Sequence, residues 1–84
     1  MRITYDASVD AAYIYLTTIA PGAVKYTQIC ALEELPGSIH LDFDEAGRLL
    51  GVEVLDASRA LTPDALRGAE RLEVPVGANS EVRP

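Results

Sequence analysis

Cysteine, histidine and basic residues are scarce in this chain of 84 residues, and tryptophan is absent. The scarcity of the first three makes several classes of functional site improbable. Cys30 is the only cysteine, so the chain has no intrachain disulfide and no thiol pair for a zinc site. His40 is the only histidine, and its spacing gives no reason to place it beside Cys30 as a catalytic base. We expect no metal, no cofactor and no identifiable catalytic residue, and we interpret Cys30 as a small buried residue on a strand.

Positive charge is also in short supply. Thirteen Asp and Glu against seven scattered Lys and Arg give a formal net charge of −6. A nucleic-acid backbone repels such a chain, so we expect no nucleic-acid binding, whereas a basic protein partner suits it. Apolar runs fall short of the ~18 residues of a membrane span, and the sequence shows no signal peptide. We therefore expect a cytoplasmic location without membrane contact.

The chain does contain apolar and polar residues that alternate with strand period. This pattern indicates strands over five segments, at residues 2–5, 11–18, 23–31, 38–43 and 48–55. Alanines leave a helix over residues 8–16 open as an alternative, although the tyrosines and isoleucines of the second segment favour a strand. A chain of 84 residues buries little surface, so a monomer would be only marginally stable and a homodimer is expected.

The last two strands surround an acidic turn. A four-residue loop over Asp44–Gly47, whose glycine takes the left-handed conformation, would pair Phe43 with Arg48 and set His40 opposite Gly51. In that register one face is wholly apolar and consists of Ile39, Leu41, Phe43, Leu50, Val52 and Val54. Because side chains alternate, a slip of one residue would divide this set between the two faces.

Helical spacing replaces strand spacing towards the end of the chain. Thr62 as a capping hydroxyl, Pro63 at the first helical position and Asp64 in the first turn are typical of a helix start. Apolar residues then recur at helical spacing as far as Leu72. The pattern predicts one helix over this segment, packed on the sheet.

The expected fold is a single α+β domain over residues 1–72. Its sheet is a mostly antiparallel meander of four to five strands, and the C-terminal helix packs on one face. Residues 73–84 contain two prolines, a glycine and no sustained period, so we predict a flexible C-terminal tail.

Two motifs resemble a known family. The first is Tyr5-Asp6-x-x-x-Asp10-Ala-x-Tyr13-Ile-Tyr-Leu16. The second is Ile39-x-Leu-Asp42-x-Asp44-x-x-Gly47-x-Leu-x-Gly51-x-Glu53-x-Leu-Asp56-Ala-Ser58. Together they resemble the DUF2283 family of small bacterial proteins over roughly residues 1–60, with a longer middle segment than is usual there. The resemblance implies a fold and no mechanism, since the family is uncharacterised. Members lie beside small toxins in some genomes, which also implies an antitoxin-like role.

The acidic turn has the spacing of a calcium-binding loop. Asp42, Asp44, Gly47 and Glu53 match ligand and glycine positions of an EF-hand. Ala46 offers no oxygen at a ligand position, and strands rather than helices flank the turn. We therefore interpret the segment as a hairpin without a metal site.

The remaining acids have local structural interpretations. Most lie in turns, where water keeps them from forming the unequal pair that acid–base catalysis needs. Asp6 follows the first strand, and we expect it to bind backbone amides of the next loop. We expect Asp56 or Ser58 to cap the start of a helical turn.

The mixed face of the last hairpin is the first place to look for a site. His40 is there either as a partly buried, hydrogen-bonded residue or as part of a small pocket. We predict a ligand or partner face that consists of Tyr13, Tyr15, His40, Asp42, Leu49 and Glu53.

Our leading hypothesis is a non-enzymatic protein-interaction module. Such a protein would be antitoxin-like and would neutralise a basic partner, for example a ribonuclease-like toxin. The alternative is a small-ligand-binding protein or an enzyme, with its site near His40 or at a dimer interface. No serine has the context of a nucleophile elbow, and no glycine cluster has the spacing of a phosphate loop. A purely structural domain also fits the sequence.

Overall fold

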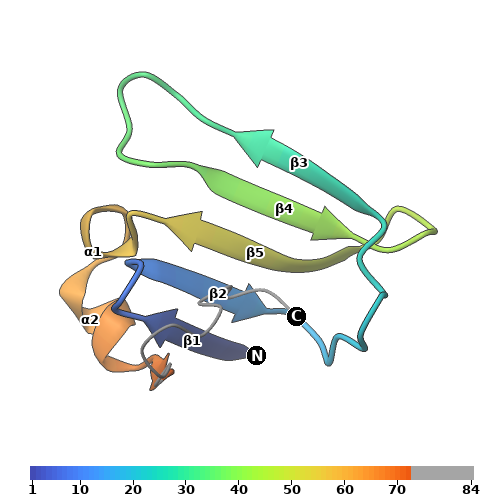
Figure 1. Cartoon of the computed structure of the whole chain (residues 1–84), viewed down its shortest axis with the longest axis horizontal. Helices are drawn as coiled ribbons and strands as arrows, with labels where there is room; N and C mark the ends of the chain where they lie inside the picture. The colour runs from blue at the N-terminus through green and yellow to red at the C-terminus, as the bar shows by residue number, and fades with distance from the viewer. Residues whose placement is uncertain (73–84) are drawn as a thin grey trace.

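Six strands form one mixed sheet in the computed structural model, which describes residues 1–72 (Figure 1). In chain order the strands are β1 (Arg2–Asp6), β2 (Ala11–Tyr15), β3 (Tyr26–Cys30), β4 (Ile39–Phe43), β5 (Leu49–Leu55) and β6 (Glu70–Arg71). Across the sheet they lie in the order β3-β4-β5-β2-β1-β6. β6 runs parallel to β1, and the other neighbouring pairs are antiparallel. The tail predicted at residues 73–84 lies outside the described residues.

Two short helices, α1 (Ala57–Ala60) and α2 (Pro63–Arg67), follow β5 and lie at one end of the sheet (Figure 1). The predicted fold class is therefore wrong. The protein is mostly β, its sheet is mixed rather than a four- or five-stranded antiparallel meander, and two short helices replace the single packed helix.

The predicted helix begins as expected but ends early. The Thr62 hydroxyl accepts a hydrogen bond from the backbone N–H of Ala65 at 3.2 Å, which caps α2. Gly68 ends α2, and the chain then pairs with the edge of β1. There the N–H of Leu72 donates to the carbonyl of Tyr5 at 2.9 Å. Unpaired backbone groups at a sheet edge favour an extended partner, which a continued helix would not supply.

All five segments with strand period do form strands, but four of them are shorter than predicted, and two lose several residues to loops. β2 ends at Tyr15 rather than at residue 18, and β3 begins at Tyr26 rather than at residue 23. Cys30 lies on a strand as predicted, but the prediction that it is buried is wrong. It is exposed because β3 is an edge strand without a described neighbour on its outer side.

The pairing of β4 with β5 differs from the predicted register. Phe43 pairs with Leu49 rather than with Arg48, and His40 pairs with Glu53 rather than with Gly51. A bulge at this point leaves one extra residue on β5, which a sequence pattern does not reveal. From Ile39 to Asp42 the pairing is displaced by two residues, so these side chains stay on their predicted faces. Phe43 and Leu49, predicted on opposite faces, now pair and share one face.

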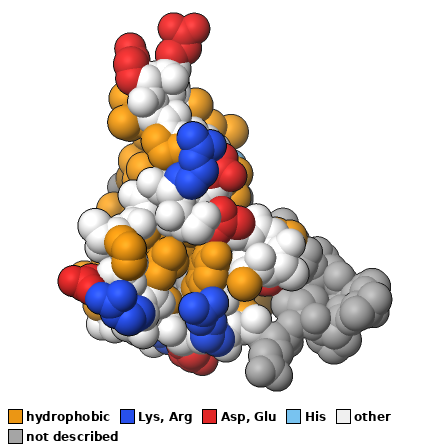
Figure 2. Space-filling view, turned by 90° about the vertical axis from the view of Figure 1, so that its left-hand side faces the viewer, with side chains coloured by type: hydrophobic (Ala, Val, Ile, Leu, Met, Phe, Trp, Pro, Cys, Tyr) orange, Lys and Arg blue, Asp and Glu red, His pale blue; other side chains and the backbone are white. Residues whose placement is uncertain are grey.

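Alternation along the strands gives the sheet two chemically different faces. Between β1 and β3, the apolar face carries no charged side chain, and its members are Ile3, Tyr5, Ala12, Ile14, Gln28, Cys30, Ile39, Leu41, Val52 and Val54. Helix α1 lies against β2 and β5 at one end of this face. The core cluster is formed there by Tyr5, Ala12, Val54 and Ala57, with Leu61, Leu66 and Ala69 packed against it. Figure 2 views this end of the molecule, where hydrophobic side chains gather between Lys and Arg side chains.

The rest of the apolar face is only partly covered. Ile3, Ile39 and Leu41 lie outside the core cluster, and Ile14 and Val52 lie at its border. All five are at least partly exposed, and Ile39 is 36% exposed. We call these five residues the open apolar face.

Candidate functional site

Buried polar side chains gather on the opposite face of the sheet, which we call the polar face. Its buried members with polar groups are Thr4, Asp6, Tyr13, Asp42 and Glu53. The Oγ1 of Thr4 and the Oδ2 of Asp6 have no hydrogen-bond partner within the described part of the chain. Burying polar groups costs free energy unless they are well paired. Apolar packing alone therefore does not explain why polar side chains occupy these buried positions, and we consider the polar face as a candidate site.

Tyr13 of β2 reaches Asp42 of β4 across the strand between them. Its hydroxyl donates to Oδ2 of Asp42 at 2.7 Å, and the Thr27 hydroxyl donates to Oδ1 of the same carboxylate at 2.7 Å. The Tyr13 ring crosses Gly51 of β5, where a β-carbon would lie 2.5 Å from Cε1 of Tyr13. The absence of a side chain at Gly51 therefore makes the bond between Tyr13 and Asp42 possible.

His40 joins two other side chains on the polar face. Its Nδ1 lies 3.1 Å from Oε1 of Glu53, and its Nε2 lies 3.1 Å from Oγ of Ser38. The side chains of His40 and Glu53 are only 16% and 11% exposed. The interpretation of His40 as a partly buried, hydrogen-bonded residue is confirmed. Its predicted place opposite Gly51 is wrong, because the bulge moves Glu53 into that position.

The predicted ligand or partner face is divided by the structure. Tyr13, Asp42 and Glu53 are buried on the polar face together with the largely buried His40. Tyr15 lies beside them, with its ring centroid 4.7 Å from that of Tyr13. Leu49 lies apart, beyond the bulge, and is 39% exposed. Whether these residues bind a ligand or a partner stays a prediction.

The predicted ligand or partner face left out two polar side chains that contact its members, Ser38 and Thr27. Ser38 lies two residues before His40, so strand alternation was a signal that both share a face. Thr27 meets Asp42 only through the pairing of β3 with β4, which the sequence does not specify.

A second polar network holds the helical end of the molecule. Asp10 accepts hydrogen bonds from the Tyr5 hydroxyl at 2.7 Å, and from the backbone N–H and hydroxyl of Ser58 at 2.9 and 2.7 Å. The Ser58 hydroxyl, followed by that of Tyr5, holds the pKa of Asp10 below its usual range. The same bond to Asp10 raises the pKa of Tyr5. Asp10 thereby connects β1 to the start of α1.

This network replaces part of the predicted capping. Asp6 binds the N–H and hydroxyl of Ser8 at 2.9 and 2.6 Å, as expected for its loop. Asp56 takes a left-handed conformation, with φ of 54°, and makes no side-chain cap on α1, so that half of the prediction is wrong. Ser58 acts as a donor to the distant Asp10 rather than as a cap of its own turn.

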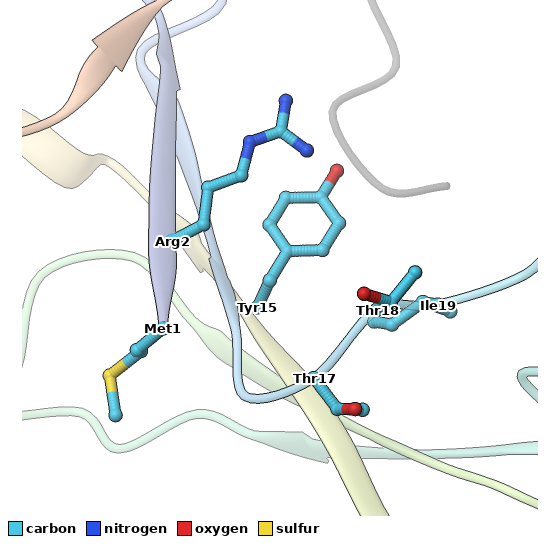
Figure 3. A pocket seen from close by; sticks show the side chains of 6 residues that line it. All are labelled: Met1, Arg2, Tyr15, Thr17, Thr18 and Ile19. Atoms are coloured by element: carbon cyan, nitrogen blue, oxygen red, sulfur yellow. The ribbon is translucent and has the colours of Figure 1, made fainter.

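A surface hollow of about 420 Å³ opens where β1 and β2 meet the loop that follows β2 (Figure 3). It is lined by Met1, Arg2, Tyr15, Thr17, Thr18 and Ile19. The guanidinium of Arg2 stacks on the Tyr15 ring at 4.9 Å and pairs with Glu70 at 2.9 Å. Because Glu70 already balances this charge, the hollow offers little attraction to an anion.

The carboxylates of the calcium-like motif do not converge. Asp42 binds Tyr13 and Thr27, whereas Asp44 accepts from the backbone N–H of Arg48 at 2.9 Å. Within residues 1–72, no group of three His, Cys, Asp or Glu is arranged to hold a metal. Neither described helix has the length and apolar character needed to cross a membrane.

The geometry defines a small single-sheet domain with a helical cap at one end and buried polar residues on one face. The sequence profile of DUF2283, described as a protein of unknown function, matches residues 2–58. The chain therefore belongs to the DUF2283 family. Comparison with curated proteins gave no match, and neither did comparison with solved structures.

Proposed function

We propose that this chain is a protein-interaction module that forms a homodimer through the open apolar face. The main support for the proposal is that, between β1 and β3, this face of the sheet has no charged side chain and is only partly covered. Stable domains bury a sheet face against a second layer. In this chain the helices cover one end of the apolar face, and a partner protein covers the open apolar face at the other end.

The charge distribution favours a second copy of the chain as that partner. Buried acids lie on the polar face, and the exposed ones lie in loops, in helices and on β6. Two acidic copies can therefore meet at the open apolar face without bringing carboxylates together. A basic partner would find no carboxylate on this face to bind. These apolar side chains are therefore best buried when the open apolar faces of two copies pack against each other.

Two isoleucines provide a matched test. Ile39 and Ile29 lie on the neighbouring strands β4 and β3 and are 36% and 59% exposed, but only Ile39 belongs to the apolar face. Light scattering after size exclusion should give twice the chain mass for the native protein and for Ile29→Lys. Ile39→Lys should shift the equilibrium towards the monomer by about tenfold or more, because a charge would be buried without a partner.

Both lysines lower the net negative charge equally, so general repulsion between copies does not explain a difference. Circular dichroism checks that each variant is folded. A native protein that is monomeric at high concentration, or a dimer that both variants keep, contradicts the proposal.

A basic partner remains the finer part of the proposal and would give the protein an antitoxin-like role. Its support is the net charge of −6 and the exposed Glu33 and Glu34 in the loop between β3 and β4. In Figure 2 acidic side chains stand at the tip of the molecule, where Figure 1 places this loop. Such a projecting acidic tip is suited to electrostatic capture of a basic protein.

Co-expression tests this part separately. If the neighbouring gene encodes a small basic toxin, the native chain should co-purify with it and restore growth. The double variant Glu33→Gln, Glu34→Gln should bind more weakly, with the largest loss at low salt. Failure to co-purify together with failure to restore growth would rule out the antitoxin-like role and leave the dimer untouched.

A further inference from the structure

Three polar side chains at the start of β4 form a linear chain of contacts on the polar face. Ser38 precedes β4, His40 follows on the same face, and Glu53 lies directly opposite His40 on β5. The Oγ of Ser38 lies 3.1 Å from Nε2 of His40, and Nδ1 of His40 lies 3.1 Å from Oε1 of Glu53. Each nitrogen of one imidazole therefore has its own oxygen partner.

The direction of these hydrogen bonds follows if Glu53 is ionised and the imidazole of His40 is neutral. An ionised carboxylate only accepts, so Nδ1 of His40 carries the proton that Glu53 binds. In the neutral imidazole, Nε2 then holds the lone pair, and the Ser38 hydroxyl is the donor to it. This is the order in which serine, histidine and an acid are joined in enzymes that activate a serine hydroxyl.

We propose that Ser38 is a nucleophile for acyl transfer, activated by His40 as the base and by Glu53 as the group that positions the imidazole. The substrate class is a small activated ester. Ser38 is half-buried at the start of a strand, so a compact acyl group can approach it from solvent. The site is on the polar face, and this activity goes beyond the interaction role of the open apolar face.

The proposed reaction balances without a cofactor. Oγ of Ser38 forms a bond to the ester carbonyl carbon while its proton moves to Nε2 of His40. The bond from the acyl carbon to the alcohol oxygen then breaks, and the leaving alcohol takes that proton. Water repeats the sequence on the acylated serine, which releases a carboxylic acid and restores the hydroxyl. Glu53 stabilises the imidazolium at each step and keeps its own charge.

A fluorophosphonate probe tests the nucleophile directly on the full-length chain. Oγ of Ser38 should attack phosphorus, fluoride should leave, and the intact mass should increase by one adduct. Peptide mapping should place the adduct on Ser38, and Ser38→Ala should remove it. Ser58→Ala is the matched control, because the Ser58 hydroxyl donates to Asp10 rather than to an imidazole. That variant should label like the native chain.

The rate of labelling tests the roles of the other two residues. His40→Gln should slow labelling by about 100-fold and Glu53→Gln by about tenfold, while circular dichroism shows that each remains folded. An unlabelled native chain, an adduct elsewhere, or equal rates in His40→Gln and the native chain would overturn the proposal. If one of these two variants does not fold, the other still decides whether the rate depends on the relay. The dimer variants on the opposite face leave these rates unchanged, so the two proposals fail independently.

Discussion

Tyr13 lies across Gly51, and the contact is so close that no side chain fits beneath the ring. A β-carbon at Gly51 would lie 2.6 Å from the Tyr13 hydroxyl oxygen and 2.8 Å from Cζ. The same placement lets the hydroxyl donate to the fully buried Asp42 at 2.7 Å. One glycine thus allows β2 and β4 to share a hydrogen bond over the top of β5.

Gly51→Ala should destabilise the fold by about 1–3 kcal/mol, because the new methyl group must displace the Tyr13 ring from Asp42. Gly68→Ala is the matched control, since a β-carbon there meets only Ala65 and Asp64 carbonyl oxygens at ordinary contact distance. Urea unfolding followed by circular dichroism measures both. Equal midpoints for the two variants would show that the crossing of Tyr13 over Gly51 is not important for stability.

Tyr13→Phe should also cost about 1–3 kcal/mol, because it removes a donor from a buried carboxylate while keeping the ring. Tyr15→Phe keeps both the tilted ring contact with Tyr13 and the stacking of Arg2, so its cost should be below about 0.5 kcal/mol. The comparison uses the same unfolding measurement. A Tyr13→Phe protein as stable as the Tyr15→Phe protein would contradict the assigned hydrogen bond.

The pattern of the sequence predicted which side chains share a face but not how the strands are matched. Period-two alternation placed Ile39, Leu41 and Val52 together, and the structure agrees. The bulge then moved Glu53 opposite His40, and nothing local in the sequence marks a bulge. From Ile39 to Asp42 the prediction of faces was correct, because the displacement there is two residues. At Phe43 the displacement is one residue, so Phe43 and Leu49 share a face against the prediction.

Contacts distant in sequence account for the other differences. Asp10 and Ser58 are separated by 48 residues, so their hydrogen bond depends on how β2 and β5 pair. The end of α2 likewise depends on the open edge of β1, which draws Glu70 and Arg71 into the sheet. Local helical spacing competes with such tertiary pairing, and here the pairing prevails.

Acid should weaken the fold through Asp10, whose folded-state pKa is lowered mainly by Ser58. The unfolded value is about 3.9, so this contribution is complete above that pH and is lost as the pH falls through the lower folded pKa. Ser58→Ala removes the largest cause, so the pKa of Asp10 should rise and acid unfolding should begin at higher pH. Carbon NMR titration of the carboxyl groups measures the first effect and circular dichroism the second.

Ser8→Ala is the control for this prediction, because the Ser8 hydroxyl binds Asp6 and not Asp10. It should leave the Asp10 titration where the native protein has it. A titration of Asp10 that is the same in the Ser58→Ala and native proteins would show that the hydroxyl of Ser58 does not hold this carboxylate.

The open apolar face is the central claim, and intermolecular NOEs in a mixture of isotope-labelled and unlabelled chains test it most directly. Methyl groups of Ile14, Leu41 and Val52 in one copy should show NOEs to the same set in the other copy. We expect these contacts at concentrations where light scattering shows a dimer. A dimer whose intermolecular NOEs involve only the edge strand β3 or the polar face, with none from these three residues, would contradict it.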